Sequence, residues 1–540
     1  MKLLKFKIPG TYFGSPGIWN AYFIFAIGLY FYDYTAFSVP LNLALVIALC
    51  LRFKVRGLNT LTRVVTALCA LALLYHDSYL PSPSQILSQR DNIEGFSIEY
   101  VLAFLKGFVN VQMMTAALCL LVVVILLSDY IRFSAITAIC FAFAVFMKPS
   151  FLQERGIPDT AACPAKSAED QALVSSDLIP QRGESTDSAL TKWHDAFYEK
   201  EKERAVKMPE ALPEDFTPFG IVIVNICSLS DDDLNATAMA AHPVFRRFDL
   251  RFESFNSATS YSTPASMRLL RASCGQETEA DMYAQRKPSC ELMTQLSTLG
   301  FRPSVFLDHN GTYGDYLKTL GKLAGLPQEI NDQKNLKIAY RSFDGSPVFD
   351  DGDVFRQYER SVLSDAGSSD VTFFNLIALH DGNRFADSGK SAPYPKRLSK
   401  LLDDLNDFMD ALERSHLRVA LMIVPEHGAQ FRGDHMQIAT LREIPTSRIT
   451  KVPVYVRFFG KARTSEQINL KGYYSYLALS DLVRRCIENN YYGDKGDLKT
   501  LTEDLPQTWP VSEATNAEFM LFKGKEFYRL KKEPWSAYHY

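Results

Sequence analysis

The sequence predicts two fold classes in one chain: an α-helical transmembrane domain over residues 1–149, and an α/β sandwich over 213–540 with a mostly parallel central sheet flanked by helices. Two observations lead to this prediction. Long uncharged apolar runs are confined to the first 150 of the 540 residues, and strand-like runs alternate with helical patterns farther along. A chain of this length exceeds the usual size of a single core, so at least two units are expected.

Five apolar runs in the first part alternate with short polar joints, and we interpret each as a membrane helix. They are Ile18–Tyr32, Phe37–Phe53, Val64–Tyr75, Val111–Ser128 and Ser134–Met147. Several are shorter than the roughly 20 residues that cross a bilayer core, although flanking residues such as Tyr75, Tyr130 and Lys148 can extend or anchor them. A cleavable signal peptide is not expected, because the first run lacks a small-residue cleavage site.

Basic residues near the helix ends predict the orientation of this domain. Three lysines precede the first run, four cations fill the joint after the second, and the joint after the first has none. The cations in question are Lys2, Lys5, Lys7, Arg52, Lys54, Arg56 and Arg63. Both basic segments should face the cytoplasm. With five crossings, the chain after Met147 then emerges on the opposite side, which in a bacterium is the periplasm.

The loop after the third run contains "IEGFSIEYVLAFLKGF", residues 93–108. This segment fits an interfacial helix that lies on the membrane. It fits the start of the fourth helix equally well, and the sequence does not choose between them.

Residues 150–212 are polar and rich in Gly and Pro, which is typical of a linker, with one short helix around Ala189–Lys207. Short apolar runs follow, interpreted as strands: "FGIVIVNICSL", "RPSVFLDH", "VTFFNLIALH", "LRVALMIVPEH" and "VPVYVRFF". Helical patterns such as "SKLLDDLNDFMDALERS" and "YSYLALSDLVRRCIENN" separate or follow them. Strands buried on both faces that alternate with helices indicate a largely parallel sheet.

Chemically active side chains lie where these strands end. Cys227 follows the first strand, His380 ends the "VTFFNLIALH" segment, and Glu426 and His427 follow "LRVALMIVP". Ligand sites in such sheets lie outside the carboxyl ends of the strands. Each residue alone is more often structural, but together thiolate, carboxylate and imidazole favour Zn²⁺ over Mg²⁺ or Ca²⁺.

The segment "YSTPASMRLLRA" predicts a helix start, because Pro264 belongs in a first turn and Ser262 or Thr263 fits the cap. A hydroxyl at a helix N-terminus lies where backbone N–H groups stabilise anions. If zinc also binds that oxygen, its alkoxide becomes a competent nucleophile toward phosphorus. The alternative is a simple helix cap.

Longer strings carry a family resemblance. "NICSLS", "FNSATSYS", "RLLRASCGQ", "ALHDGNR" and "VPEHGAQFRGDHMQIATLREIPT" resemble the bacterial cellulose phosphoethanolamine transferases, the G component of the cellulose-secretion machinery, in the alkaline phosphatase superfamily. The resemblance extends over essentially the whole chain. It implies an alkaline-phosphatase-like sandwich and a zinc-dependent transferase.

The resemblance also implies roles for individual residues. Ser262 matches the nucleophile, and the zinc ligands comprise Ser262, Cys227, Glu426 and His427. Tyr261, His380 and Arg442 match residues that line the substrate site; His380 is the candidate proton donor or phosphate contact, and His435 is a weaker candidate for the same site. Lipid A-modifying relatives have an acidic residue in place of Cys227, threonine for Ser262 and aspartate for Glu426, which leaves zinc affinity open. A second metal is also left open.

The implied reaction is ping-pong transfer of phosphoethanolamine from phosphatidylethanolamine to a glucose hydroxyl of nascent cellulose, most simply the C6 alcohol, through a phospho-serine intermediate. The implied location is the bacterial inner membrane, with the catalytic domain in the periplasm. The expected partners are the lipid donor, the cellulose acceptor and the cellulose synthase complex. A net charge of −3 gives no indication of nucleic-acid binding.

The cysteines fit an exported domain. Cys274 and Cys290 flank a polar loop, and we predict a disulfide between them, worth roughly 3 kcal/mol for a loop of that size. Cys227 must stay unpaired to bind metal, and Cys163 and Cys486 are expected to be unpaired.

Alternatives remain at this point. A glycerol-phosphate or lipid A enzyme of the superfamily would share the donor chemistry, whereas a sulfatase needs an arginine that "STPAS" lacks. A non-catalytic protein that only stabilises the synthase complex is the remaining alternative. The strand end "FLDHNGTYGDY", with His309, is a candidate lining of an acceptor cleft, and aromatic residues could stack on glucose rings, but the sequence cannot choose among 37 Phe and 26 Tyr.

Overall fold

The structure, a computed structural model, describes residues 11–13, 15–31, 35, 37–53, 55–77, 111–147, 186–362, 369–434, 436–463, 466–494, 496–522 and 524–540. Two compact units divide the chain. The first holds Met1–Thr160 with two short later segments, and the second holds Ala161–Gly433 and Ala439–Tyr538. The segment 93–108 and most of the expected linker lie outside the described residues.

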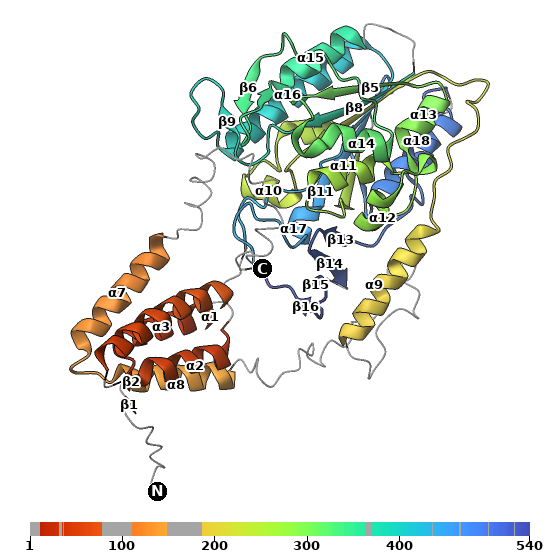
Figure 1. Ribbon diagram of the computed structural model, residues 1–540. Coiled ribbons are helices and arrows are strands. Elements are labelled where there is room, and N and C mark those ends of the chain that lie inside the picture. Colours follow the sequence, from red (N-terminus) through yellow and green to blue (C-terminus); the bar gives the residue numbers. More distant parts are fainter. Residues whose placement is uncertain are drawn as a thin grey trace. The chain divides into compact units, whose positions relative to one another are not determined.

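The first unit is helical over its described residues (Figure 1), apart from a short antiparallel pair of strands, β1 (Thr11–Phe13) and β2 (Leu51–Phe53). Its helices coincide with the five apolar runs: α1 (Trp19–Phe31), α2 (Val39–Cys50), α3 (Arg56–Asp77), α7 (Val111–Leu127) and α8 (Phe133–Met147). By length and composition one described helix, over Gly57–Asp77, can cross a membrane; the other four are shorter apolar helices. Five crossings therefore stay a prediction.

Buried polar side chains join the helices of this unit. Thr137 of α8 donates to Asn20 Oδ1 of α1 at 2.9 Å, and Asn42 of α2 donates to Asp77 Oδ2 of α3 at 2.9 Å. Such bonds hold helices together where apolar surface alone gives little preference between packing arrangements.

The second unit is built on a seven-stranded sheet of order β12-β4-β11-β10-β3-β8-β5. Its strands are β3 (Gly220–Ile226), β4 (Leu250–Asn256), β5 (Arg302–Leu307), β8 (Asp370–Leu376), β10 (Val419–Ile423), β11 (Lys451–Phe459) and β12 (Ile468–Leu470). The sheet is mixed, because β11 runs antiparallel to both β10 and β4, whereas the other pairs are parallel. Among the described residues between β10 and β11, the one helix is the four-residue α17 (Ser447–Thr450), and antiparallel neighbours need no long crossover helix.

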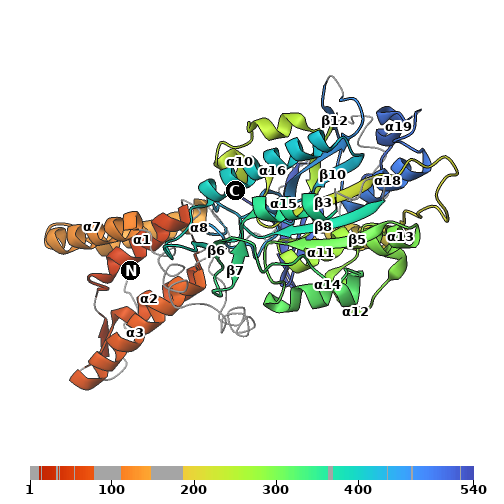
Figure 2. The same ribbon diagram turned by 90° about the horizontal axis from the view of Figure 1, so that it is seen from above.

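Helices cover both faces of this sheet (Figure 2). One core forms with α11 (Ser262–Leu270), α13 (Leu292–Thr298), α14 (Tyr316–Ala324) and α18 (Tyr476–Glu488), and the other with α10 (Asp231–Ala236), α15 (Asp351–Ser361) and α16 (Tyr394–Ser415). The remaining short helices of this unit are α12 (Glu279–Ala284), α19 (Leu498–Thr502) and the 3₁₀ turns η3 (Pro243–Arg247), η4 (Pro288–Cys290) and η5 (Tyr313–Asp315). The sandwich expected from the sequence is therefore present, and its sheet is mixed only through β11, since the other six strands of the described sheet run in one direction as expected.

Two smaller sheets complete the second unit, and the sequence analysis did not predict them. One is antiparallel, with β13 (Val511–Ala514), β14 (Ala517–Phe522), β15 (Lys525–Leu530) and β16 (Ser536–Ala537); the other has β7 (Pro347–Phe349), β6 (Ile338–Arg341) and β9 (Arg384–Phe385).

Helix α9 (Thr186–Lys202) packs against the four-stranded sheet region. Trp193 contacts Trp509 edge to face at 5.8 Å, and Asp187 accepts a hydrogen bond from the Trp535 backbone. The helix expected around Ala189–Lys207 is therefore present as α9, although it packs as part of this unit and not in a free linker.

Candidate active site

The carboxyl ends of β3 and β10 bring three of the expected residues together. The two strands are parallel neighbours with Val224 opposite Ile423. Beyond them, the Glu426 N–H donates to the Ile226 carbonyl at 2.8 Å, and the Cys227 N–H donates to the Leu376 carbonyl of β8 at 2.9 Å. The parallel register therefore continues past the strands and holds Cys227 and Glu426 side by side.

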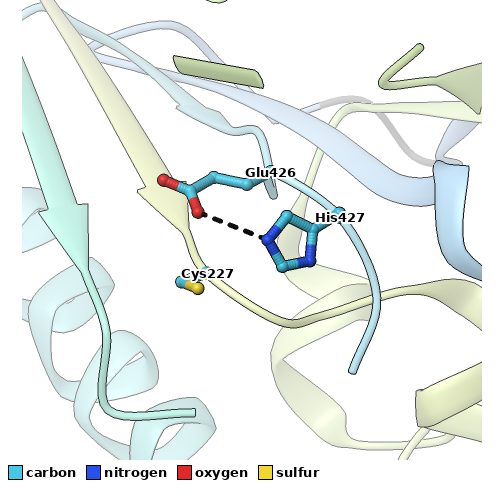
Figure 3. Close-up of side chains that lie close together, drawn as sticks. All are labelled: Cys227, Glu426 and His427. Carbon is cyan, nitrogen blue, oxygen red and sulfur yellow. Dashed lines mark ion pairs between the residues drawn. The ribbon is translucent and has the colours of Figure 1, made fainter. Parts of the chain in front are cut away.

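Cys227, Glu426 and His427 are buried, and one ligand atom from each lies within 4.8 Å of the others (Figure 3). The Glu426 Oε2 atom is 3.9 Å from His427 Nε2. The backbone turns sharply here, because Ser228, the residue after Cys227, is left-handed with φ of 62°. A non-glycine residue in that region is strained, and strain of this kind gathers at functional sites.

Ser262 completes the cluster from α11. Its Oγ lies 3.3 Å from Cys227 Sγ and 3.2 Å from His427 Nε2. Ser262 is the first residue of the helix and Tyr261 is its cap, so the expectation that Ser262 or Thr263 caps the helix is wrong by one residue. The Tyr261 side chain does not cap the helix backbone, and the Ser262 hydroxyl contacts Cys227 and His427.

His427 has a defined tautomer. Its Nδ1 is 2.9 Å from the Gly428 carbonyl oxygen, an acceptor only, so Nδ1 carries the proton. The Nε2 lone pair therefore faces Ser262. A neutral imidazole with its other nitrogen bonded to a carbonyl is the usual state of a metal-ligating histidine.

A buried polar network fixes Glu426. Its Oε1 accepts hydrogen bonds from Asn375 Nδ2 at 2.6 Å and Ser266 Oγ at 2.9 Å. Its Oε2 is buried and has no hydrogen-bond partner. Since buried carboxylate oxygens are normally paired, the unpaired Oε2, 3.9 Å from His427 Nε2, is available to a ligand of the cluster.

The network extends to the loop after β5. The Gly311 N–H donates to His309 Nδ1 at 3.1 Å, so His309 Nε2 carries the proton and donates to Asn375 Oδ1 at 2.9 Å. That bond orients the Asn375 amide, whose Nδ2 then points to Glu426 and also to Asn225 Oδ1 at 2.9 Å. Each hydrogen bond in this series therefore has a defined donor and acceptor, and the last one ends at Glu426 Oε1.

Burial shifts the acid–base properties of the cluster. It raises the pKa of the Cys227 thiol, as does the nearby Glu426 carboxylate, and it also raises the pKa of Glu426. Burial and the Arg442 guanidinium lower the pKa of His427. All three shifts favour the uncharged forms, and a divalent cation would relieve the repulsion between two anionic ligands.

Three expected substrate-site residues surround this cluster. Arg442 Nη1 donates to Ser228 Oγ at 3.4 Å, and its Nε is buried without a hydrogen-bond partner. Tyr261 donates its hydroxyl to Glu443 Oε1 at 3.2 Å. His380 donates from Nδ1 to the Asp381 carbonyl at 2.8 Å, and burial and Arg442 lower its pKa to about 4. His380 is thus neutral at neutral pH and presents its Nε2 as an acceptor. His435 lies outside the described residues.

The loop that carries His427 is anchored by Asp233. This residue forms a capping box with Ser230 at the start of α10. Its Oδ2 also accepts from the Ala429 N–H at 2.7 Å, and its Oδ1 from the Phe431 N–H at 3.1 Å. A Cβ at Gly428 would lie 2.6 Å from Ser230 Oγ, so this close packing requires glycine.

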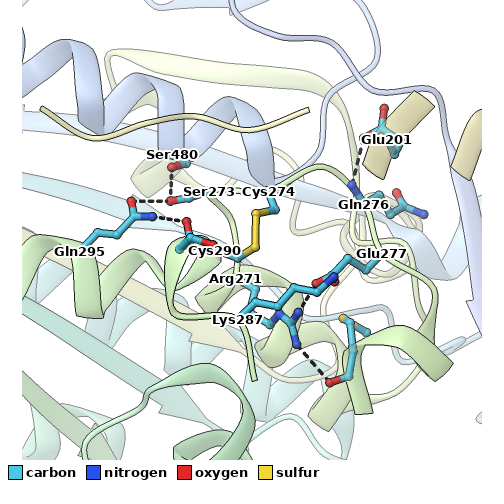
Figure 4. The surroundings of a disulfide bond; sticks show 12 residues. Glu201, Arg271, Ser273, Cys274, Gln276, Glu277, Lys287, Cys290, Gln295 and Ser480 are labelled. Atoms are coloured by element: carbon cyan, nitrogen blue, oxygen red, sulfur yellow. Dashed lines mark hydrogen bonds and ion pairs between the residues drawn. A yellow bond between two sulfur atoms is a disulfide. The ribbon is translucent and has the colours of Figure 1, made fainter. Parts of the chain in front are cut away.

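A disulfide joins Cys274 and Cys290, as expected, just beyond the end of α11 (Figure 4). Around it, Ser273 Oγ hydrogen-bonds Ser480 at 2.9 Å, and Arg271 pairs with Glu277 at 2.5 Å. Cys227 is a free cysteine. The helix that Ser262 begins is therefore fixed covalently near its far end.

Sequence reasoning missed Asn225, Ser266 and Asn375. Two signals were available: each asparagine is the one polar side chain near the end of an apolar strand, "GIVIVNI" and "DVTFFNL", and Ser266 is four residues after Ser262, on the same helix face. The β3–β8 register pairs Asn225 with Asn375 directly.

Comparison with known proteins identifies the family. The model of the cellulose biosynthesis protein BcsG C-terminal domain matches residues 175–535, and that of the BcsG N-terminal domain matches residues 19–146. Cellulose biosynthesis protein BcsG of Escherichia coli K12 is 38% identical over 537 residues, 96% of each chain, and that of Salmonella typhimurium LT2 is 38% identical over 538 residues, also 96% of each. This chain belongs to the BcsG family.

Solved structures share a more distant likeness. A protein in the alkaline phosphatase superfamily from Vibrio parahaemolyticus has a TM-score of 0.46 at 12% identity, covering 62% of this chain and 82% of its own. The integral membrane lipooligosaccharide phosphoethanolamine transferase A from Neisseria meningitidis has a TM-score of 0.39 at 11% identity, covering 91% of this chain and 98% of its own.

Proposed function

We propose that this protein is a membrane-anchored phosphoethanolamine transferase of the alkaline phosphatase superfamily that acts in cellulose biosynthesis. The donor is phosphatidylethanolamine, and the acceptor is a glucose hydroxyl of nascent cellulose, with the C6 alcohol as the first candidate. Family membership supports the link to cellulose, because the curated relatives are cellulose biosynthesis proteins. The residues of the site support the chemistry.

One observation carries the proposal. The Ser262 hydroxyl, in the first turn of α11, lies within 3.3 Å of both Cys227 Sγ and His427 Nε2. A serine at a helix N-terminus, next to groups that can lower the pKa of its hydroxyl or hold a cation, has the environment of an activated nucleophile.

The ligand set fits zinc. A thiol, an imidazole Nε2 with a free lone pair and the unpartnered Glu426 Oε2 converge within 4.8 Å. Cys227, Glu426 and His427 would hold the ion, with Ser262 as the fourth ligand, which suits four-coordinate zinc. When bound, the ion would supply Lewis-acid stabilisation of the Ser262 oxyanion and of a phosphoryl oxygen.

The protein's own residues would then perform two displacements. In the first, Ser262 Oγ loses its proton and attacks the donor phosphorus, the phosphorus–oxygen bond to diacylglycerol breaks, and the leaving diacylglycerol oxygen takes up that proton. In the second, a glucose hydroxyl loses its proton and attacks the same phosphorus, the bond to Ser262 Oγ breaks, and Ser262 Oγ takes up a proton in turn. His380, neutral and presenting Nε2, would accept the glucose proton, and the Arg442 Nε would hold a phosphoryl oxygen.

The helical first unit gives this enzyme access to a lipid donor. We propose that its apolar helices span the bacterial inner membrane as a multi-pass domain and that the catalytic unit lies in the periplasm. The synthase complex is the proposed protein partner, since the acceptor is its product.

Ser262→Ala in the full-length protein tests the function. The expected result is loss of the phosphoethanolamine signal in solid-state NMR of cellulose from cells that carry only this variant, together with loss of a phosphoethanolamine adduct on the protein in mass spectrometry. Thr263→Val, which removes the neighbouring hydroxyl, is the matched control and should retain both signals.

The result separates the remaining alternatives. Modified cellulose from Ser262→Ala cells would exclude the catalytic assignment and leave a scaffold role. In wild-type cells, an adduct on Ser262 together with unmodified cellulose would place the acceptor outside cellulose, as in a lipid A-directed or glycerol-phosphate enzyme.

A further inference from the structure

The structure selects one aromatic residue where the sequence could not. Among the described residues of the second unit, only two large apolar side chains are more than 40% exposed: Tyr283, at 44%, and Tyr313, at 42%. Tyr283 lies on α12, and Tyr313 begins η5 in the loop after β5. An aromatic ring left in water is a candidate ligand contact where it adjoins a functional site.

Tyr313 is connected to the candidate site by ring contacts. Its ring meets Phe343 edge to face, with centroids 4.7 Å apart and an interplanar angle of 87°. Phe343 in turn packs on His380 at 5.0 Å and 33°. Phe343 is only 6% exposed, so Tyr313 is the exposed end of an aromatic row that leads to His380.

The loop that carries Tyr313 is held in place at both ends. On one side, His309 is bonded to Asn375 and through it to Glu426. On the other, the Leu317 N–H donates to the Gly311 carbonyl at 3.0 Å, and a Cβ at Gly311 would lie 2.9 Å from Leu317 Cβ. A binding residue on such a fixed loop loses little freedom when its ligand binds.

We propose that Tyr313 is a stacking platform for a glucose residue of the acceptor chain, next to the residue that reacts at His380. This rests on the proposed function, which it deepens by naming an acceptor subsite. The pyranose rings of a β-linked glucan have flat faces of C–H groups and hydroxyls at their edges. Such a face packs on an aromatic ring while the Tyr313 hydroxyl stays in water. The platform favours an oligomeric acceptor, because a single glucose cannot occupy both positions.

Full-length protein in detergent tests the proposal, with cellohexaose as the acceptor probe. Binding is measured by calorimetry, and transfer by mass spectrometry of the modified sugar. Tyr313→Ala should weaken cellohexaose binding and raise its KM about 3- to 10-fold, the range for loss of one aromatic contact, with kcat and the release of diacylglycerol unchanged. Tyr313→Phe should restore cellohexaose binding. Tyr283→Ala is the matched control, because Tyr283 is about as exposed as Tyr313, and this variant should bind cellohexaose like the wild type.

The outcomes separate this inference from the proposed function. Cellohexaose binding that is equal in Tyr313→Ala and the wild type overturns the platform, as does a loss of diacylglycerol release, which would assign the ring to the lipid. Absence of wild-type binding also overturns it. Tyr313-dependent binding without any transfer would leave the platform standing and refute the proposed reaction.

Discussion

Asn375→Leu is predicted to weaken zinc binding, although Asn375 would not itself contact the ion. The side chain donates to Glu426 Oε1 at 2.6 Å and to Asn225 Oδ1 at 2.9 Å, and it accepts from His309 at 2.9 Å. Leucine has a similar volume and makes none of these bonds. Glu426 Oε1 would keep its bond from Ser266 and lose the bond from Asn375, so the orientation of the carboxylate would be less firmly fixed.

The expected magnitude follows from this loss. Removing an outer-shell partner of a metal ligand typically costs 10- to 100-fold in affinity, or about 1.4–2.7 kcal/mol. The His309 N–H would also be left buried without its partner, which costs the fold roughly 1–3 kcal/mol. A domain with a free energy of unfolding of about 5–15 kcal/mol can lose this much stability and remain folded.

The assay is competition for zinc between the purified full-length protein and a chelator of known affinity. Asn256→Leu is the matched control, because Asn256 is also buried and bonded, donating to the Val511 carbonyl at 2.9 Å and accepting from Ser512 Oγ at 3.0 Å. It should lower stability without changing the zinc dissociation constant. Equal zinc affinity in Asn375→Leu and the wild type would refute the idea that this network orients Glu426.

Three further predictions concern stability, and urea unfolding measures each. Cys290→Ser opens the disulfide and should lower the free energy of unfolding by roughly 3 kcal/mol, and reductant should have no further effect on this variant. Gly428→Ala forces a Cβ to within 2.6 Å of Ser230 Oγ and should lower the free energy of unfolding by about 1–3 kcal/mol. Gly220→Ala is the control, because its Cβ would have its nearest neighbour at 3.7 Å, and it should lower the stability less. Equal losses of stability in the two variants would contradict the packing argument. Burial raises the pKa of Asp308 to about 7, so the folded state keeps a proton that the unfolded chain loses above about pH 4. The stability that this group contributes is therefore present at low pH and is lost as the pH rises toward 7. Asp308→Asn should reduce this decrease in the free energy of unfolding with rising pH.

Much of the candidate site could be predicted because parallel strands bring their carboxyl ends to one edge. Cys227, Glu426 and His427 each follow an apolar strand, and β3 and β10 are parallel neighbours. The polar support was not predictable in the same way. Asn375 reaches Glu426 only because β8 lies on the other side of β3, and strand order is set by packing between distant segments rather than by local pattern.

Local pattern also failed where tertiary contacts decide the structure. β11 has the buried composition of a parallel strand, yet it runs antiparallel beside β10, and the described connection between them holds the four-residue helix α17 in place of a long crossover helix. The sequence predicts the helix α9 but not its docking, since its mean composition is hydrophilic, whereas its few apolar residues such as Trp193 are buried. One stripe of apolar side chains is enough to dock a helix.

The strand order has a consequence for the order of synthesis. Asn225 and Val424, which bond across β3 and β10, are 199 residues apart, so Cys227 leaves the ribosome long before the glutamate and histidine beside which it will be buried. During that interval its thiol is open to exchange with other cysteines. Cys274 and Cys290 are separated by only 16 residues, and a short loop closes early. Once they are joined to each other, neither offers a free thiol for oxidative pairing with Cys227, so the spacing of the cysteines favours a Cys227 that stays unpaired until Glu426 and His427 are in place.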